Sequence, residues 1–162
     1  MRARALFLLP LLFAVLAASG CQPAVDLTKN LEVRDVTTGW FDAGIVDGQN
    51  KLVPSISFKL KNLSNQTLVM LQVNAVFRRG TENEDWGSGF LTAAGTNGLA
   101  PGAVTDTITL RSDRGYKGTD SRQEMLHNSQ FVDAKVRLSA KYGSSLLAHI
   151  GEYPVTRELI TR

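Results

Sequence analysis

The sequence has little of the chemistry that builds catalytic or metal centres. Its 162 residues contain one cysteine, Cys21, and two histidines, His127 and His149. A single cysteine excludes an intrachain disulfide, so packing and backbone pairing must hold the fold together. A metal site would need both histidines to meet in space with carboxylates, and no serine lies in a G-x-S-x-G nucleophile elbow. We therefore expect no catalytic activity and no cofactor.

The sequence also lacks an apolar run long enough to span a membrane. Its most apolar stretch, Leu6–Ala18, has thirteen residues and is interrupted by Pro10, whereas a spanning helix needs about 20. This stretch follows Arg2 and Arg4 and ends in the small residues Ala17–Gly20. A basic start, a short apolar run and small residues are typical of a secretory signal peptide. We predict a signal peptide over residues 1–20, which places the rest of the chain outside the cytoplasm.

Cys21 directly follows this segment. The string Leu-Ala-Ala-Ser-Gly-Cys at residues 16–21 resembles the lipobox of bacterial lipoproteins, although Ala18 stands where that family most often has leucine. The resemblance implies that Cys21 is the first mature residue and the lipid attachment site, carrying acyl chains such as palmitate. Gln22 after the cysteine implies sorting to the outer membrane, with the domain facing the periplasm. The alternative is an ordinary secreted protein with an unpaired thiol.

Charge of one sign is also scarce once the signal peptide is removed. The full chain carries a net charge of +3, but residues 1–20 include Arg2 and Arg4, so the remaining 142 residues carry 16 basic and 15 acidic side chains. This near balance gives no basic excess for nucleic-acid binding. The length fits one domain. We predict a polar, lipidated tether over residues 21–30 and a single domain over residues 31–162.

Alternating apolar and polar residues indicate half-buried β-strands. The pattern is strict over residues 55–63, and one apolar face recurs over 68–78 and 131–142. We predict that 55–63 and 68–78 pair as an antiparallel hairpin across turn residues in 62–67. Further strands are expected at residues 31–38, 89–94, 104–110 and 146–155.

Three connecting stretches have weaker patterns. Residues 39–50 predict an irregular segment with a turn at Asp47-Gly48. The alternative for this stretch is a hairpin with Trp40, Phe41, Ile45 and Val46 packed underneath. Residues 112–119 predict an exposed loop. Residues 120–128 predict the one helix, because Ser121 and Glu124 form a capping-box pattern ahead of two apolar residues.

Short strands, glycine-rich turns and one short helix favour an all-β fold. We predict an antiparallel immunoglobulin-like sandwich of about seven strands, with a closed antiparallel β-barrel as the alternative. The NLSNQT turn, a β-branched strand and the Leu-Ala-Pro-Gly turn, within residues 52–110, resemble the FxLYD-type domains of bacterial envelope lipoproteins. The chain lacks the F-x-L-Y-D string itself. The resemblance implies a binding or structural module.

One candidate contact site stands out. Arg114, Tyr116, Lys117 and Arg122 lie close together in the sequence, and cationic groups beside an aromatic ring suit phosphate, carboxylate or glycan contacts. The alternative is an ordinary charged surface with Tyr116 tucked into the sandwich. We expect a non-catalytic, membrane-anchored envelope lipoprotein that binds a protein partner or has a structural role. A small-ligand or glycan binder that uses a groove near Trp86, Tyr116 and the basic loop is the second hypothesis, and a hydrolase ranks last.

Overall fold

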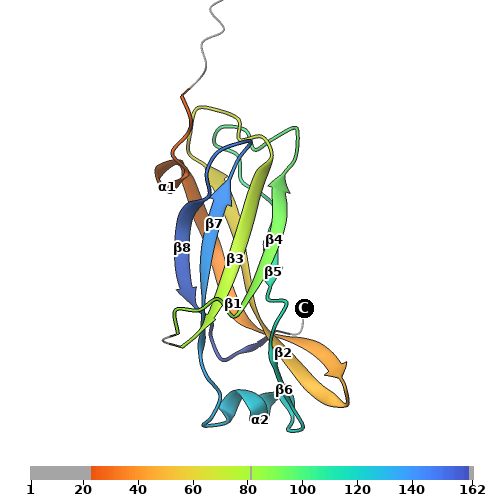
Figure 1. Ribbon diagram of the computed structural model, residues 1–162. Coiled ribbons are helices and arrows are strands. Elements are labelled where there is room, and N and C mark those ends of the chain that lie inside the picture. The colour runs from red at the N-terminus through yellow and green to blue at the C-terminus, as the bar shows by residue number, and fades with distance from the viewer. Residues whose placement is uncertain (1–22, 81, 161–162) are drawn as a thin grey trace, which may run out of the picture.

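Two sheets face each other in the computed structural model, which describes residues 23–80 and 82–160 (Figure 1). In the first sheet the strand order is β5-β2-β1-β9, and β6 also pairs with β2; in the second it is β4-β3-β7-β8. The first sheet consists of β1 (Leu31–Val46), β2 (Gln49–Asn62), β5 (Ile108–Arg111), β6 (Tyr116–Gly118) and β9 (Leu159–Ile160). The second consists of β3 (Leu71–Arg79), β4 (Gly87–Ala94), β7 (Ala134–Lys141) and β8 (Ala148–Pro154), and the helices are α1 (Leu27–Asn30) and α2 (Arg122–His127).

The all-β, sandwich-like fold agrees with the sequence prediction, and the closed barrel is wrong. The strands of the described residues form two separate sheets, each with free edges. They number nine where about seven were expected. The surplus consists of β6 and β9, which have three and two residues and are too short to carry a periodic signal.

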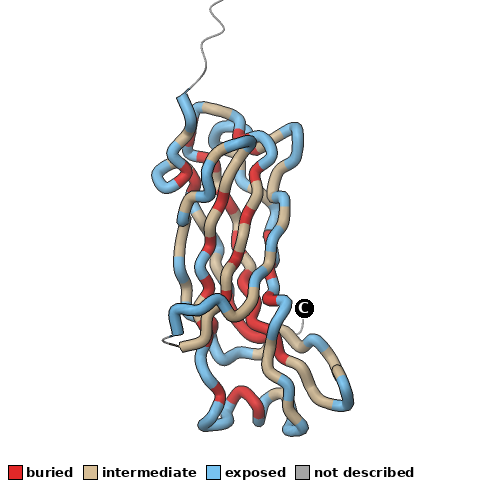
Figure 2. The backbone as a smooth tube through the Cα atoms, viewed as in Figure 1, coloured by how far each residue is buried: buried red, intermediate tan, exposed pale blue. Residues whose placement is uncertain are grey.

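The core lies between the two sheets. Along β3 and β7 every second residue is buried, and β2 contributes Ile56, Phe58 and Leu60, each with no exposed surface. Figure 2 shows these buried positions along the middle of the strands. Burial of alternate side chains from both sheets supplies the main driving force for the fold. The alternation predicted for these strands is confirmed in their interiors, while Val69 and Val132 lie outside the strands and are exposed.

The predicted hairpin between residues 55–63 and 68–78 is wrong. β2 pairs with β1, β5 and β6, whereas β3 pairs with β4 and β7 in the opposite sheet. The chain crosses between the sheets because Asn62, fully buried, organises the connection. Its amide nitrogen donates to the carbonyl oxygens of Gln66 (2.7 Å) and Leu99 (2.8 Å), and its Oδ1 accepts from the Ser64 backbone N–H (2.9 Å).

The segment after Thr38 is the second half of β1 and not an irregular stretch, and the alternative of a hairpin here is confirmed, because β1 pairs with β2 across Asp47-Gly48. β1 runs on to Val46, with register shifts that absorb its bends. The Asp47-Gly48 turn is confirmed: φ is 53° and 75° at the two residues, as a two-residue type I′ turn requires. Trp40 is buried as predicted, but Ile45 is 70% exposed, because this end of the β1–β2 hairpin projects beyond the sandwich (Figure 1).

The predicted helix is confirmed as α2, with the Ser121–Glu124 capping box in place. The loop expected over 112–119 contains β6, which adds a third strand to the projecting hairpin. No helix of residues 23–80 and 82–160 has the length and apolar character needed to cross a membrane.

Part of the stretch that we predicted to be a tether is folded. α1 covers Leu27–Asn30, and Leu27 is buried. The Val25 backbone N–H donates to the Tyr142 hydroxyl. The predicted signal peptide and lipid site, Cys21, lie outside the described residues. Pro23 and α1 are at one end of the elongated sandwich, and α2, β6 and the β1–β2 turn are at the other (Figure 1).

Candidate functional site

Four aromatic rings close the end of the sandwich that carries α2. Trp40 of β1 is fully buried and meets Phe131 edge to face, with ring centres 4.6 Å apart. Tyr116 of β6 lies 4.9 Å from Phe131 and 4.9 Å from Trp86. These separations fall in the range at which aromatic pairs attract beyond simple burial. The aromatic cluster (Trp40, Trp86, Tyr116 and Phe131) therefore joins both sheets at this end.

Two arginines lie against the cluster. The Arg79 guanidinium is 5.7 Å from the Trp86 ring centre, and that of Arg157 is 5.2 Å from Phe131. Arg157 also donates to the Phe131 carbonyl oxygen (2.9 Å) and to the Asp133 carboxylate (2.6 Å), and the hydrogen bond to Asp133 raises the pKa of Arg157 above its usual value. Burial raises the pKa of Tyr116, so its ring remains a neutral member of the cluster at pH 7.

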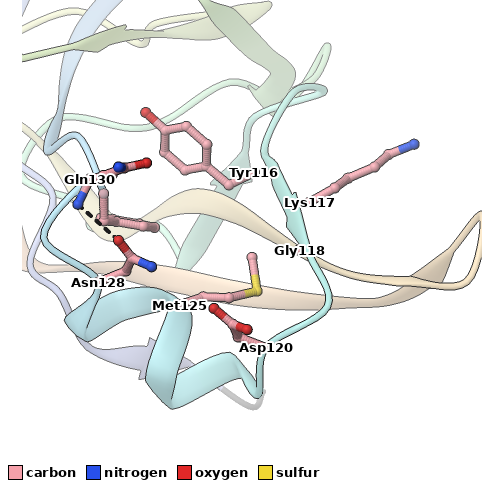
Figure 3. A pocket seen from close by; sticks show the side chains of 8 residues that line it. Tyr116, Lys117, Gly118, Asp120, Met125, Asn128 and Gln130 are labelled. Atoms are coloured by element: carbon pink, nitrogen blue, oxygen red, sulfur yellow. Dashed lines mark hydrogen bonds between the residues drawn. The ribbon is translucent and has the colours of Figure 1, made fainter.

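A shallow pocket of about 170 Å³ opens beside the cluster, between β6 and α2 (Figure 3). Tyr116, Phe131 and Met125 give it an apolar wall. Polar groups come from Asp120, Asn128 and Gln130, and the Gln130 backbone N–H donates to Asn128 Oδ1 (2.9 Å). The pocket is smaller than the 300–1,000 Å³ typical of small-molecule sites. Its size and mixed wall suit one inserted side chain.

Two of the predicted contact residues form ion pairs with the projecting hairpin. Lys117 Nζ lies 2.6 Å from Asp47 Oδ2, and the Arg122 guanidinium pairs with Asp42. The hydrogen bond from Arg122, with one from the Gly44 N–H, lowers the pKa of Asp42, and Lys117 lowers that of Asp47. These cations therefore hold the β1–β2 hairpin against β6 and α2.

The structure does not gather the four predicted residues into one site. Tyr116 and Lys117 border the pocket between β6 and α2, but Arg114 lies in a separate, more polar hollow of about 340 Å³. Trp86, Asp85, Asp113 and Ser88 also line that hollow. Trp86 belongs to both regions, because it lines the hollow and its ring centre also lies 4.9 Å from that of Tyr116 beside the pocket.

Sequence reasoning missed Phe131, Met125 and Asp42 as members of this region. Met125 was expected only on the apolar side of a helix, and Phe131 only as the start of a strand. Neither assignment brings them to Tyr116, because that proximity depends on the pairing of β6 with β2, for which three residues give no periodic signal. The signal that could have found this contact was opposite charge: Asp42 and Asp47 lie before and in the predicted turn, and residues 114–122 are rich in basic side chains.

The two histidines make separate local contacts. His127 Nδ1 lies 2.7 Å from the Gln123 carbonyl oxygen within α2, and Arg137 Nε donates to His149 Nδ1 (3.2 Å) between β7 and β8. In the part of the chain that the structure describes, no three His, Cys, Asp or Glu side chains form a group that could hold a metal ion.

Comparison with family models, with curated proteins and with solved structures gave no match to this chain.

Proposed function

We propose that this protein is a non-catalytic lipoprotein of the bacterial cell envelope, anchored by lipid at Cys21, whose sandwich presents its α2 end to a protein partner. The observation that carries the proposal is that the start of the described chain and the aromatic cluster lie at opposite ends of the sandwich (Figure 1). Pro23, two residues after Cys21, lies at one end, and the aromatic cluster, α2 and the projecting hairpin lie at the other (Figure 1). A lipid at Cys21 directs the second end away from the membrane.

The strand order supports an immunoglobulin-like assignment. Immunoglobulin sandwiches place strand B beside A and E in one sheet, and strand C between C′ and F, with G at the edge, in the other. β5-β2-β1 and β4-β3-β7-β8 follow these two orders if β1 is taken as strand A. One departure is the buried tryptophan, which lies on β1 here and on strand C in antibody domains.

The shape of the α2 end favours a protein partner. Ile45 is 70% exposed near the tip of the hairpin, and the pocket beside Tyr116 has the size of one side chain. Interfaces between proteins combine an apolar anchor with a polar rim, and the Asp47–Lys117 and Asp42–Arg122 pairs provide charged groups around this end. We propose that the partner lies in the periplasm, facing the outer membrane.

The test begins with the anchor. The chain is expressed with its full sequence in a bacterial host, and membrane partition and intact mass are compared between wild type and Cys21→Ala. The proposal expects a diacylglyceryl and acyl mass increment and membrane partition only in the wild type. An unmodified thiol in the mature wild-type chain contradicts it.

The partner surface is tested separately with a photoreactive amino acid at Ile45, against a matched control at Phe90. Both side chains are large, apolar and mostly exposed, but Phe90 lies on β4, away from α2. A discrete protein adduct from position 45 and none from position 90 supports the proposal. Equal labelling from both positions, or none, contradicts a partner site at the α2 end.

A second candidate function has one observation in its favour. The hollow that contains Trp86 and Arg114 measures about 340 Å³, within the range for small ligands, and combines an indole with carboxylates and a guanidinium. This combination suits a glycan. Titration with soluble cell-wall saccharides, followed by tryptophan fluorescence in wild type and Arg114→Ala, tests it; no saturable change in the wild type rejects it.

A further inference from the structure

The end of the sandwich opposite α2 exposes a group of large apolar side chains. Leu146 is 91% exposed and Leu147 is 52% exposed. Five large apolar side chains that are exposed lie in the loops that join β2 to β3 and β7 to β8 at this end. We call them the N-terminal rim: Leu63, Val69, Met70, Leu146 and Leu147. Single exposed apolar residues are ordinary, whereas several together mark an interaction surface.

Hydrogen bonds tie the rim loops to the start of the described chain. Gln66 Nε2 donates to the Pro23 carbonyl oxygen (3.0 Å), which connects the loop of Leu63 to Pro23. The Val25 backbone N–H donates to the Tyr142 hydroxyl at the base of the β7–β8 turn. The loops that carry the rim therefore contact the start of the described chain on two sides.

The β7–β8 turn is in turn fixed to the loop that precedes β3. The Gly143 backbone N–H donates to the Val69 carbonyl oxygen (3.0 Å), so Leu146 and Leu147 belong to the same end surface as Val69 and Met70. The leucines are thus held by the fold at this end.

The distance to the anchor decides what can cover the rim. Cys21 and Pro23 are two residues apart, and two extended residues reach at most about 7 Å. The headgroup layer on one side of a bilayer is itself about 5–8 Å thick. A lipid chain on Cys21 begins at that layer. The two-residue step from Cys21 to Pro23 is therefore too short to hold the domain away from the headgroups.

We propose that the N-terminal rim lies in the membrane interface, with Leu146 and Leu147 inserted among the lipid headgroups and upper acyl chains. This inference rests on the proposed lipid at Cys21. It adds a second contact, between the domain itself and the membrane surface, and that contact fixes the orientation of the domain. Apolar side chains at an interface bury about 5–10 Å into the headgroup and acyl boundary. The orientation that results points α2 and the projecting hairpin into the periplasm.

The experiment uses the full chain, processed in a bacterial host, purified and reconstituted into vesicles of phosphatidylethanolamine and phosphatidylglycerol. The variants are Leu146→Trp and, as the matched control, Ile45→Trp. Both positions are at least 70% exposed, so a tryptophan fits without repacking the core. Fluorescence is compared between vesicles with ordinary lipids and vesicles with brominated acyl chains, which quench only tryptophans at the membrane. The native Trp40 and Trp86, in the aromatic cluster at the far end, supply the background.

The inference expects a loss of emission in brominated vesicles for Leu146→Trp, together with a blue shift, and no loss beyond the parent protein for Ile45→Trp. If brominated lipids quench Leu146→Trp no more than Ile45→Trp, in protein that floats with the vesicles and carries the lipid mass, the rim contact is overturned and the anchor remains. Protein that lacks the lipid mass and stays in solution overturns the anchor and the rim contact together.

Discussion

The two ends of the sandwich are closed in different ways. At the α2 end, four aromatic rings fill the space between the sheets, and Trp40 among them is fully buried. At the opposite end, a buried polar side chain, Asn62, connects three segments by hydrogen bonds, and large apolar side chains face outward. The first closure is apolar with a charged surface, and the second is polar with an apolar surface.

This difference indicates which physical effect determines each part of the structure. A cluster of rings is stabilised mainly by buried area, which is large but not directional. A buried amide must meet defined partners, since each unpaired polar group costs free energy. The aromatic end should therefore contribute more to stability, and the Asn62 end should do more to determine the path of the chain.

The largest expected effect comes from removing the centre of the aromatic cluster. Trp40→Ala should lower the free energy of unfolding by about 3–5 kcal/mol, the range for a large buried aromatic residue. Trp40→Phe should cost clearly less, because it keeps a ring and removes an indole N–H that has no hydrogen-bond partner in the described residues. Urea unfolding measures both. Trp86→Ala is the control: Trp86 is only half-buried, and an equal cost there would contradict this role for Trp40.

Replacement of Asn62 should have the next largest effect. Asn62→Ala removes the hydrogen bonds to the Gln66 and Leu99 carbonyl oxygens and leaves the buried Ser64 backbone N–H without its acceptor, which costs about 2–4 kcal/mol in total. Asn65→Ala, in the same loop but exposed, should stay within about 0.5 kcal/mol of wild type. Hydrogen exchange would add a distinction, because Asn62→Ala should lose protection in the 63–70 connection. Unchanged stability would remove Asn62 as the residue that directs the crossing.

The same residue explains where prediction from the sequence failed. Alternation over residues 55–63 and 68–78 correctly identified two strands and the buried faces of their interiors. Alternation reports only that one face is buried, and a strand in either sheet satisfies it. Whether the connection reverses within one sheet or crosses to the other depended on the contact between Asn62 and Leu99, 37 residues away, which local patterns do not contain.

The candidate site shows the same limit. Asp47-Gly48 and the Ser121–Glu124 box were predictable, because turn geometry and helix capping depend on residues within three positions. The grouping of Trp40 with Tyr116 and Phe131 required the pairing of a three-residue strand. The separation of Arg114 from Lys117 also depends on a contact between distant residues. Arg114 lies in the loop before β6, and its neighbour Asp113 accepts from the Ser88 N–H of β4 (2.8 Å), so closeness in sequence did not make one site.

The smallest expected effect concerns the ion pairs that hold the projecting hairpin. Asp42→Asn should lower the free energy of unfolding at pH 7 by about 0.2–1 kcal/mol, the range for a partly exposed pair. Arg122 lowers the pKa of Asp42 in the folded state, so this stabilisation is fully present above the unfolded pKa of about 3.9 and is lost as the pH falls through the folded value. The difference between wild type and Asp42→Asn should therefore shrink on acidification below about pH 4. Asp106→Asn, an exposed residue in none of the ion pairs of the described chain, should show no such difference at either pH. A decrease of more than about 2 kcal/mol in the free energy of unfolding for Asp42→Asn would mean that the hairpin is coupled to the aromatic cluster. The apolar interior and the charged surface of this end would then not be energetically separate.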